Sequence, residues 1–410
     1  MKRYWILALL IPFTALSISI HYVTASGNHK PDYYLKTLAG QEQEGSHIAI
    51  QGQYEADPIT IQTTGSDYPR EQQSYWQKLD SSYYYLEELG ELLHEHRSFM
   101  RGKRDVNAFF EDEKVIGYAG SETDFDLEKG QSDILDIALY DKGKKKKSAD
   151  FQVQLKKNKD EFIHITDVQV KEQSMKVLVT YQHRNETTPR QYKDTEYHMY
   201  TLDLVKGSVV DHQLIEPAAS PDNQLRTSTT NVWTSDQIKA NRYAIFDRMT
   251  YKLNDAEEDT VELRNKGMVN REILVYDIWN GQLTRVQNEP MRNLLLNAKS
   301  DELTIRQVGD ELYITKMSDS GESRVLRFDL IGNVVKSDVK LDLQDVQKEW
   351  RRTGMFQIAK NRIYMHMSGK GNPGVAVAEL ETGKIVYQGV IERKDNLEVR
   401  NLMIDHLTIR

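Results

Sequence analysis

One glycine-rich segment carries the spacing of a nucleotide-binding loop. Residues 369–374 match G-x-G-x-x-G, a pattern in which a helix N-terminus binds a pyrophosphate. The following residues, 375–378, alternate as a strand instead of opening a helix, and Pro373 suits a turn. We therefore interpret the segment as a hairpin turn and predict no dinucleotide cofactor.

One acidic segment has oxygen ligands of the kind that calcium prefers. Asp124, Asp126 and Glu128 alternate ahead of Gly130. A calcium loop places glycine sixth and a bidentate Glu twelfth, whereas Gly130 is seventh and Leu135 is twelfth. We interpret this segment as a solvated loop and predict no metal ion in it.

The remaining candidates for catalysis or metal binding are scattered. His94 and His96 are two residues apart on a predicted helix, which puts them on different faces. The acidic residues of 255–259 again suit a solvated loop. The sequence has no H-E-x-x-H or G-x-S-x-G pattern and no Cys. We predict no catalytic, cofactor-binding or metal-binding residue, although a triad of dispersed residues stays open because triads follow geometry and not order.

A lysine-rich turn and two tyrosine groups are candidates for binding surfaces. Lys142 and residues 144–147 form a basic turn that could attract anionic polymers or lipid headgroups by about 1 kcal/mol per residue; an exposed hairpin is the alternative. The tyrosines at 33–34 and 83–85 could bind sugars or peptides but also suit strands. A glycosylation sequon begins at Asn185.

The N-terminus predicts export. Lys2 and Arg3 precede an apolar run from Trp5 to about residue 20, and small residues follow near Ala25. We expect residues 1–25 to be a signal peptide or an N-terminal membrane anchor; both stay open because the run is almost long enough to span a bilayer. The polar residues 26–45 predict a tether, and 46–410 the folded domain.

Composition narrows the partners. The 410 residues include 54 basic and 62 acidic side chains, a formal charge of −8, which argues against nucleic acid. Without Cys the domain has no disulfides, so burial must stabilise it. We expect the membrane as one partner, through the N-terminal segment, and a protein or a cell-envelope polymer as another.

The elements that must position any site are mostly strands. Residues 71–97 have apolar side chains near helical spacing and predict one inserted amphipathic helix, which either caps the β domain or docks another protein. Elsewhere short apolar runs alternate with turns. Strands are predicted at residues 47–54, 59–62, 115–118, 134–139, 177–181, 198–202, 243–246, 273–276, 312–315, 325–328, 362–367 and 375–378.

A repeated hairpin indicates the fold class. An apolar strand ends in an acidic residue and a glycine turn follows; Gly281, Gly332 and Gly383 lie 51 residues apart. A period near 50 favours an all-β β-propeller of about seven blades, within a range of six to eight. Strand-like residues near both termini predict that the two ends complete one blade together, which removes exposed sheet edges.

The hairpin at residues 377–387 resembles the outer hairpin of PQQ-like propeller repeats, whose pattern is Ala-x-Asp-x-x-Thr-Gly-x-x-x-Trp. Glu379 stands at the acidic position, Thr382 and Gly383 supply Thr-Gly, and Tyr387 replaces Trp. The segment around Gly281 is a looser copy. The resemblance, to bacterial PQQ-like and WD40-like repeat proteins in general, implies the fold alone.

We expect an exported propeller, secreted or tethered to the membrane, that binds a ligand or a protein as a scaffold and is not an enzyme. Two alternatives stay open. One is an enzyme at the propeller channel, either a polysaccharide lyase or hydrolase or a quinone-dependent dehydrogenase; it predicts charged or His side chains gathered at the channel with shifted pKa values. The other is an extracytoplasmic sensor.

Overall fold

The computed structural model describes most of the chain after residue 29. The described residues are 12–14, 16, 30–71, 87–103, 105–121, 134–155, 161–184, 192–216, 225–234, 237–252, 267–299, 302–317, 323–343, 350–369 and 371–410.

The described residues form six antiparallel sheets, numbered here in the order in which the chain builds them. Sheet 1 contains β25 (Leu402–Ile409), β2 (Ile48–Tyr54), β3 (Asp57–Gln62) and β4 (Gly65–Asp67). Sheet 2 contains β5 (Phe109–Glu111), β6 (Val115–Ser121), β7 (Ile134–Asp141) and β8 (Lys146–Gln154). Sheet 3 contains β9 (Glu161–Lys171), β10 (Ser174–Arg184), β11 (Tyr192–Asp203) and β12 (Ser208–Glu216). Sheet 4 contains β13 (Leu225–Asn231), β14 (Tyr243–Lys252), β15 (Met268–Asp277) and β16 (Gln282–Arg285). Sheet 5 contains β17 (Leu303–Val308), β18 (Glu311–Met317), β19 (Ser323–Asp329) and β20 (Val334–Leu341). Sheet 6 contains β21 (Trp350–Ala359), β22 (Arg362–Gly369), β23 (Gly374–Glu379), β24 (Ile385–Arg393) and β1 (Tyr33–Gly40).

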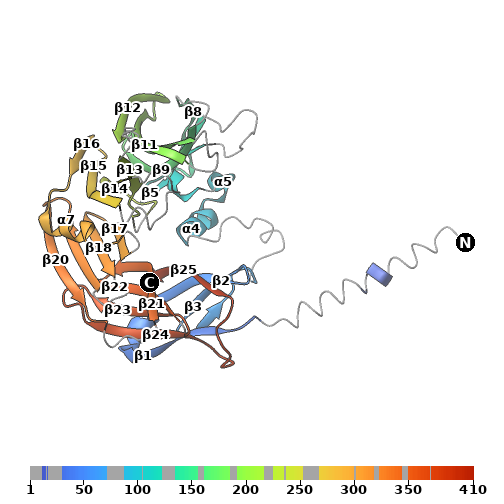
Figure 1. Cartoon of the computed structure of the whole chain (residues 1–410). Helices are drawn as coiled ribbons and strands as arrows, with labels where there is room; N and C mark the ends of the chain where they lie inside the picture. The colour runs from blue at the N-terminus through green and yellow to red at the C-terminus, as the bar shows by residue number, and fades with distance from the viewer. Residues whose placement is uncertain are drawn as a thin grey trace, which may run out of the picture.

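The sheets follow one another around an arc, so that neighbouring sheets pack face to face (Figure 1). Apolar clusters fill the junctions between sheets 2 and 3, 3 and 4, 4 and 5, 5 and 6, and 6 and 1. On β10, Val177 and Val179 face sheet 2 while Leu178 faces sheet 4. Because the middle of the strand is buried on both faces, its residues 177–179 are all apolar. This arrangement of four-stranded sheets is that of a β-propeller.

The two ends of the chain each complete a sheet. The C-terminal β25 pairs with β2, and the N-terminal β1 pairs with β24 at the edge of sheet 6. The predicted closure by both termini is therefore confirmed in sheet 1. The predicted tether over residues 26–45 is wrong from residue 33 onward, because Tyr33 and Leu35 alternate into the core of sheet 6 and the domain begins before residue 46.

The repeated acidic residue orders the hairpin between the third and fourth strands. The Oδ1 atoms of Asp203, Asp277 and Asp329 each accept hydrogen bonds from the two backbone amides two and three residues further on, at 2.9–3.2 Å. Gly281 and Gly383 have φ of 68° and 72°, the left-handed region that a Cβ disfavours. The motif is thus a turn signal, as its composition predicted.

Helices occupy two places on the β framework. Part of the predicted helix at residues 71–97 is confirmed as α4 (Glu87–Glu95), which is followed by α5 (Arg97–Met100); residues 72–86 lie outside the described part. Leu89, Leu92 and Phe99 are buried against sheet 2, which agrees with a capping role. The sequence reading missed α7 (Glu289–Leu296), whose N-cap Asn288 accepts a hydrogen bond from the Met291 amide at 3.1 Å.

Two shorter elements complete the description. The five-residue α2 (Glu42–Ser46) joins β1 to β2, and a 3-10 turn, η2 (Val106–Ala108), precedes β5. Of the described helices, none has the length and apolar character needed to cross a membrane. Apart from residues 12–14 and 16, the predicted leader at 1–25 lies outside the described residues.

Candidate functional site

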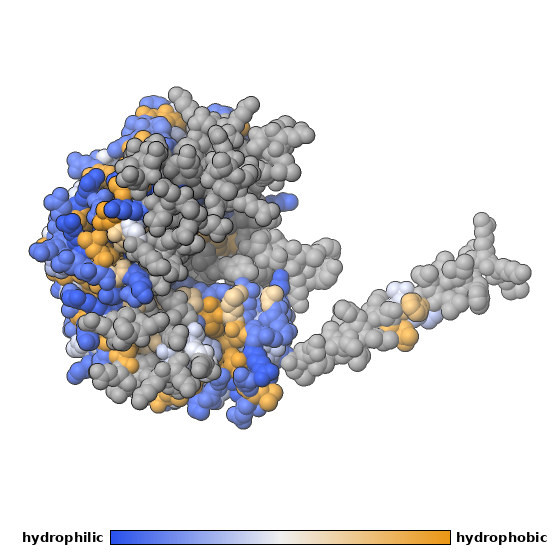
Figure 2. Space-filling model, in the orientation of Figure 1, coloured by the Kyte–Doolittle hydropathy of each residue, from blue (hydrophilic) through white to orange (hydrophobic). Residues whose placement is uncertain are grey.

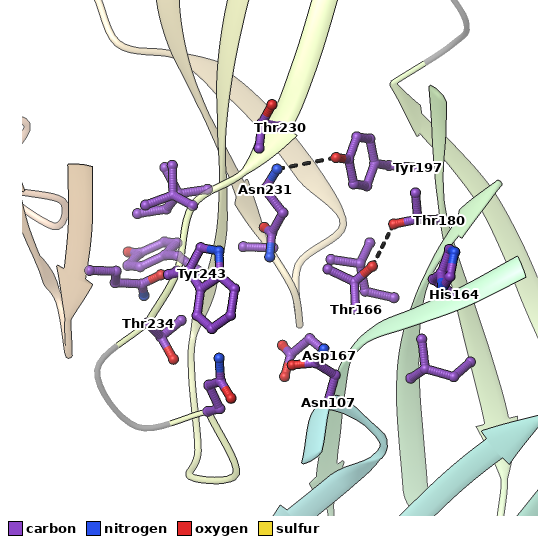
Figure 3. Close-up of a pocket in the computed structure, with 18 of the residues that line it drawn as sticks. Asn107, His164, Thr166, Asp167, Thr180, Tyr197, Thr230, Asn231, Thr234 and Tyr243 are labelled. Carbon is purple, nitrogen blue, oxygen red and sulfur yellow. Dashed lines mark hydrogen bonds between the residues drawn. The ribbon is translucent and has the colours of Figure 1, made fainter. Parts of the chain in front are cut away.

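A cavity of about 490 Å³ lies where the first strands of four sheets converge. Its walls come from β9 and β10, from β13 and β14, from the end of β17, and from the residues before β5 (Figure 3). In a propeller the first strand of each sheet lines the central channel. The cavity therefore belongs to the channel side of sheets 2 to 5.

A β-bulge turns two neighbouring residues of β9 toward this cavity. Opposite β10, Asp167 pairs with Leu178 and Ile165 with Val179, which leaves Thr166 as an extra residue. The buried positions change phase there, from 163 and 165 to 168 and 170. Both Thr166 and Asp167 consequently line the cavity, as bulged residues commonly do at binding sites.

Asp167 is the most perturbed acid of the cavity wall. Burial raises the pKa of this carboxyl to about 6, although hydrogen bonds from Gln169 and the Val168 amide favour its charged form. Gln169 Nε2 donates to Asp167 Oδ1 at 2.9 Å, and Gln169 Oε1 accepts from the Asn241 amide at 2.8 Å. Asp167 is thus held in place by a buried amide that also fixes the loop after β13.

The facing wall is built by sheet 4 (Figure 3). Tyr197 of sheet 3 bridges to it, since its hydroxyl donates to Thr229 O at 3.2 Å and accepts from the Asn231 amide at 3.1 Å. The segment after β13 contacts sheet 5, because the Gln307 amide of β17 donates a hydrogen bond to Trp233 O at 3.1 Å. The Trp233 side chain lines the cavity and is 65% exposed, so a large apolar ring is accessible there.

Three polar atoms of the lining are buried and, within the described part of the chain, have no hydrogen-bond partner. They are Thr234 Oγ1, Gln237 Oε1 and Gln307 Oε1. The Gln307 side chain is fully buried, and its Nε2 donates to Gly309 O at 3.1 Å. An unpartnered buried oxygen is costly, by about 1–3 kcal/mol each. Three of them around one cavity indicate a site built to hydrogen-bond something else.

The charges of the cavity are acidic. Asp105 and Asp167 are its two carboxyls and His164 its one imidazole, and none of its described lining residues is Lys or Arg. Burial raises the pKa of Asp105, whose Oδ1 accepts from the Asn107 amide at 3.0 Å. Most of the other polar groups are neutral amides and hydroxyls, and two of these hydroxyls, on Thr166 and Thr180, are hydrogen-bonded to each other. The site therefore favours neutral or cationic ligands over anions.

The candidates taken from sequence motifs lie elsewhere. Gly369 and Gly374 end β22 and begin β23, and the Asn372 carbonyl accepts from Trp350 Nε1 at 3.1 Å, so the glycine segment is a hairpin as predicted. The exposed His94 is on α4, whereas the His96 ring packs on Tyr140 with centroids 5.2 Å apart.

The lysine turn connects β7 to β8 and is largely paired. Lys142 Nζ lies 2.5 Å from Glu111 Oε1, Lys144 Nζ 2.9 Å from an Asp141 oxygen, and Lys147 Nζ 2.6 Å from Asp150 Oδ2. These contacts leave less charge for an outside polymer than the sequence suggested. Several other candidates lie outside the described residues: the acidic loops at 124–130 and 255–259, the sequon at 185 and the tyrosines at 83–85. Leu135, the twelfth position of the calcium-loop comparison, is on β7.

The cavity residues were missed because no local motif joins them. They come from sheets 3 to 5 and from the residues before sheet 2, and are separated by up to 202 residues in sequence. One signal was present: the apolar alternation of β9 shifts phase between Ile165 and Val168, and such a shift predicts a bulge. A bulge on a first strand would have pointed to Thr166 and Asp167.

Comparisons with known proteins find similarity at the level of fold alone. The chain resembles β-propeller domains at the level of fold, among them those of peptidases. No protein-family model and no curated protein matches the sequence.

Three solved structures illustrate the likeness. Dipeptidyl peptidase 4 of Porphyromonas gingivalis is 11% identical over 71% of this chain and 48% of its own, with a TM-score of 0.30. The propeller domain of the trilobed protease of Pyrococcus furiosus is 8% identical over 67% and 80%, with a TM-score of 0.25. A PL25 ulvan lyase is 8% identical over 74% and 92%, with a TM-score of 0.31. The chain spans about half the length of the peptidase, and such scores carry no argument about function.

Proposed function

We propose that this chain is an extracytoplasmic β-propeller that binds an uncharged, hydroxyl-rich ligand, such as a saccharide unit of the cell envelope, in the cavity of sheets 2 to 5. The observation that supports this most is the combination of an accessible indole, Trp233, with amides and hydroxyls around a space of about 490 Å³. Sugars offer an apolar face for an aromatic ring and hydroxyls for polar neighbours.

The size and charge of the site refine the ligand class. Pockets for small ligands usually have volumes of about 300–1,000 Å³, which includes this one. Since the described lining contains Asp105 and Asp167 but neither Lys nor Arg, a sulfate, phosphate or carboxylate group would be repelled. We therefore expect neutral saccharides to bind better than uronic acids or teichoic-acid fragments.

Export and tethering remain part of the proposal. The charged start and apolar run of residues 1–25 would direct the domain out of the cytoplasm, either released after cleavage or held by the uncleaved segment. The mass of the mature N-terminus decides between these two outcomes. The blade number also belongs here: we propose six blades, with the helical segment that contains α4 between the first and second instead of a seventh.

A second candidate is an enzyme at the same cavity. Asp167, with a pKa of about 6, changes charge near neutral pH, as a general acid or base must, and the imidazole of His164 lines the same cavity. Two carboxyls flanking a sugar would suit hydrolysis or lyase chemistry. Turnover of a saccharide that is lost in Asp167→Asn while binding persists would favour this candidate over simple binding.

The binding proposal is tested with neutral and anionic envelope oligosaccharides added to the full-length protein, followed by calorimetry and tryptophan fluorescence. Trp233→Ala is expected to weaken binding of the neutral sugars about tenfold, because a stacked aromatic ring is worth about 0.5–1.5 kcal/mol beyond the area it buries and about 1.4 kcal/mol corresponds to tenfold. Ile331→Ala, at another exposed apolar residue, is the matched control and should leave binding unchanged. Equal affinity of wild type and Trp233→Ala, or preference for anionic sugars, would contradict the proposal.

A further inference from the structure

A pair of histidines on sheet 3, away from the cavity, has the geometry of a metal chelate. His198 is on β11 and His212 on the outer strand β12, and both lie on the sheet face that carries Tyr200, since His212 is directly opposite Tyr200 in the register. His198 Nδ1 is 2.9 Å from His212 Nε2. A hydrogen bond joins the two rings.

The rings are held in place from both sides. The His198 ring packs on Tyr181 with centroids 4.5 Å apart, and the His212 ring is stacked on Tyr200 at 4.4 Å and 13°. The hydroxyls of these two tyrosines are 2.7 Å apart and hydrogen-bonded. The orientation of both imidazoles is therefore largely fixed before any ion arrives, which lowers the entropic cost of binding.

Glu196 orients the inner histidine. Glu196 Oε2 is 3.0 Å from His198 Nε2, so this nitrogen carries the hydrogen and donates a hydrogen bond to the carboxylate, and Nδ1 presents a lone pair toward His212. A carboxylate on the far nitrogen is the usual partner of a metal-ligating histidine, because it fixes the tautomer and makes the ligand more basic.

The spacing also selects the ion. Two metal–nitrogen bonds of about 2.0–2.1 Å that span 2.9 Å enclose an angle of about 90°. This is the angle between neighbouring ligands in a tetragonal site, typical of Cu²⁺ or Ni²⁺, and is narrower than a tetrahedral zinc site needs. Within the described chain no group of three His, Asp or Glu residues gathers to hold a metal, so the pair supplies two ligands.

We propose that His198 and His212 form a surface site for a tetragonal divalent ion, with Cu²⁺ preferred, and that Glu196 is its positioning residue. The ion takes one lone pair from His198 Nδ1 and one from His212 Nε2, and displaces the proton that the two nitrogens share, which passes to solvent. Water completes the coordination. The His212 side chain is exposed, so the ion has direct access.

The test uses CuCl₂ with the full-length protein at pH 7.5, followed by electron paramagnetic resonance and calorimetry. Wild type is expected to bind one ion with hyperfine structure from two nitrogens. His198→Gln and His212→Gln should each lose that two-nitrogen signal, and Glu196→Gln should weaken binding about tenfold or more. His94→Gln, at an exposed histidine of α4, is the matched control and should behave as wild type.

Two results would overturn the proposal. One is a wild-type protein that gives no stoichiometric two-nitrogen copper signal, in which case the pair is a hydrogen bond only. The other is an unchanged signal in both His198→Gln and His212→Gln. Circular dichroism of each variant confirms that the sheet is intact, and the wild-type spectrum alone decides the question if a variant does not fold.

Discussion

The outer hairpins and the cavity wall of this propeller differ in how their polar groups are satisfied. In the hairpins the same acidic residue and glycine recur, the acids face solvent, and their oxygens are satisfied by backbone amides of the same turn. In the cavity wall no residue recurs, burial raises the pKa of Asp167, and three oxygens lack hydrogen-bond partners among the described residues. The repeat thus stabilises the framework, and departures from it create the site.

Three of the hairpin glycines have a further structural role, because the turns at Gly207, Gly281 and Gly383 each rest on the outer strand of the preceding sheet. A Cβ at Gly383 would come within 1.9 Å of Lys340 O on β20, and one at Gly281 within 3.3 Å of Gln213 Oε1 on β12. At Gly207 the neighbour is Phe151 of β8, 3.5 Å away. The glycine therefore permits both the left-handed turn and the contact between blades.

The largest effect is expected at the hairpin that packs most tightly. Gly383→Ala should lower the free energy of unfolding by about 3 kcal/mol, since the positive φ and the backbone clash with Lys340 add. Gly281→Ala, with the same φ but only a side chain nearby, is the matched control and should cost about 1 kcal/mol. Urea denaturation measures both; equal costs would show that contact between blades does not matter.

At the cavity wall the opposite sign is expected. Asp167→Asn should raise the free energy of unfolding by up to about 3 kcal/mol at pH 8, because ionising a carboxyl whose folded pKa is about 6 destabilises the fold. Wild type should lose this stability as pH rises from about 4 to 6, and the variant should not. Denaturation curves at pH 4 and pH 8 test this. A variant that is less stable than wild type at pH 8 would contradict the claim that ionised Asp167 destabilises the fold.

A single turn carboxylate should matter less. Asp329→Ala removes the acceptor for the Ile331 and Gly332 amides, which remain exposed to water, so the free energy of unfolding should fall by less than it changes in the two preceding variants. Asp329→Asn keeps an oxygen acceptor and should recover part of it. A thermal melt of the three proteins measures the difference; no change in Asp329→Ala would mean that the glycine alone specifies the turn.

The smallest effect on stability is expected at Trp233. Because this side chain is 65% exposed, Trp233→Ala should change the free energy of unfolding by less than about 0.5 kcal/mol while it weakens ligand binding. The melting temperature measured without ligand checks this. A large loss of stability would place Trp233 in the framework and not in the site.

Sequence reasoning recovered the framework because its signals are local. Twelve predicted strands and the turns at Asp203, Asp277 and Asp329 depend only on alternation and turn chemistry. It missed β1, whose short alternation at Tyr33 and Leu35 follows a polar stretch, and α7, which is only eight residues long. The cavity and the His198–His212 pair depend on which strands become neighbours, and a single sequence does not contain that information in readable form.

The closure of sheet 1 by β25 also determines when the molecule can finish folding. β2 must wait for residues that follow it by about 360 positions, since Ile48 pairs with Ile409. A contact of such long range forms slowly because the loop that it closes is large. Until β25 has been synthesised, β2 cannot form this pairing, and that edge of the first sheet stays exposed. During that interval, assistance from a chaperone would matter most.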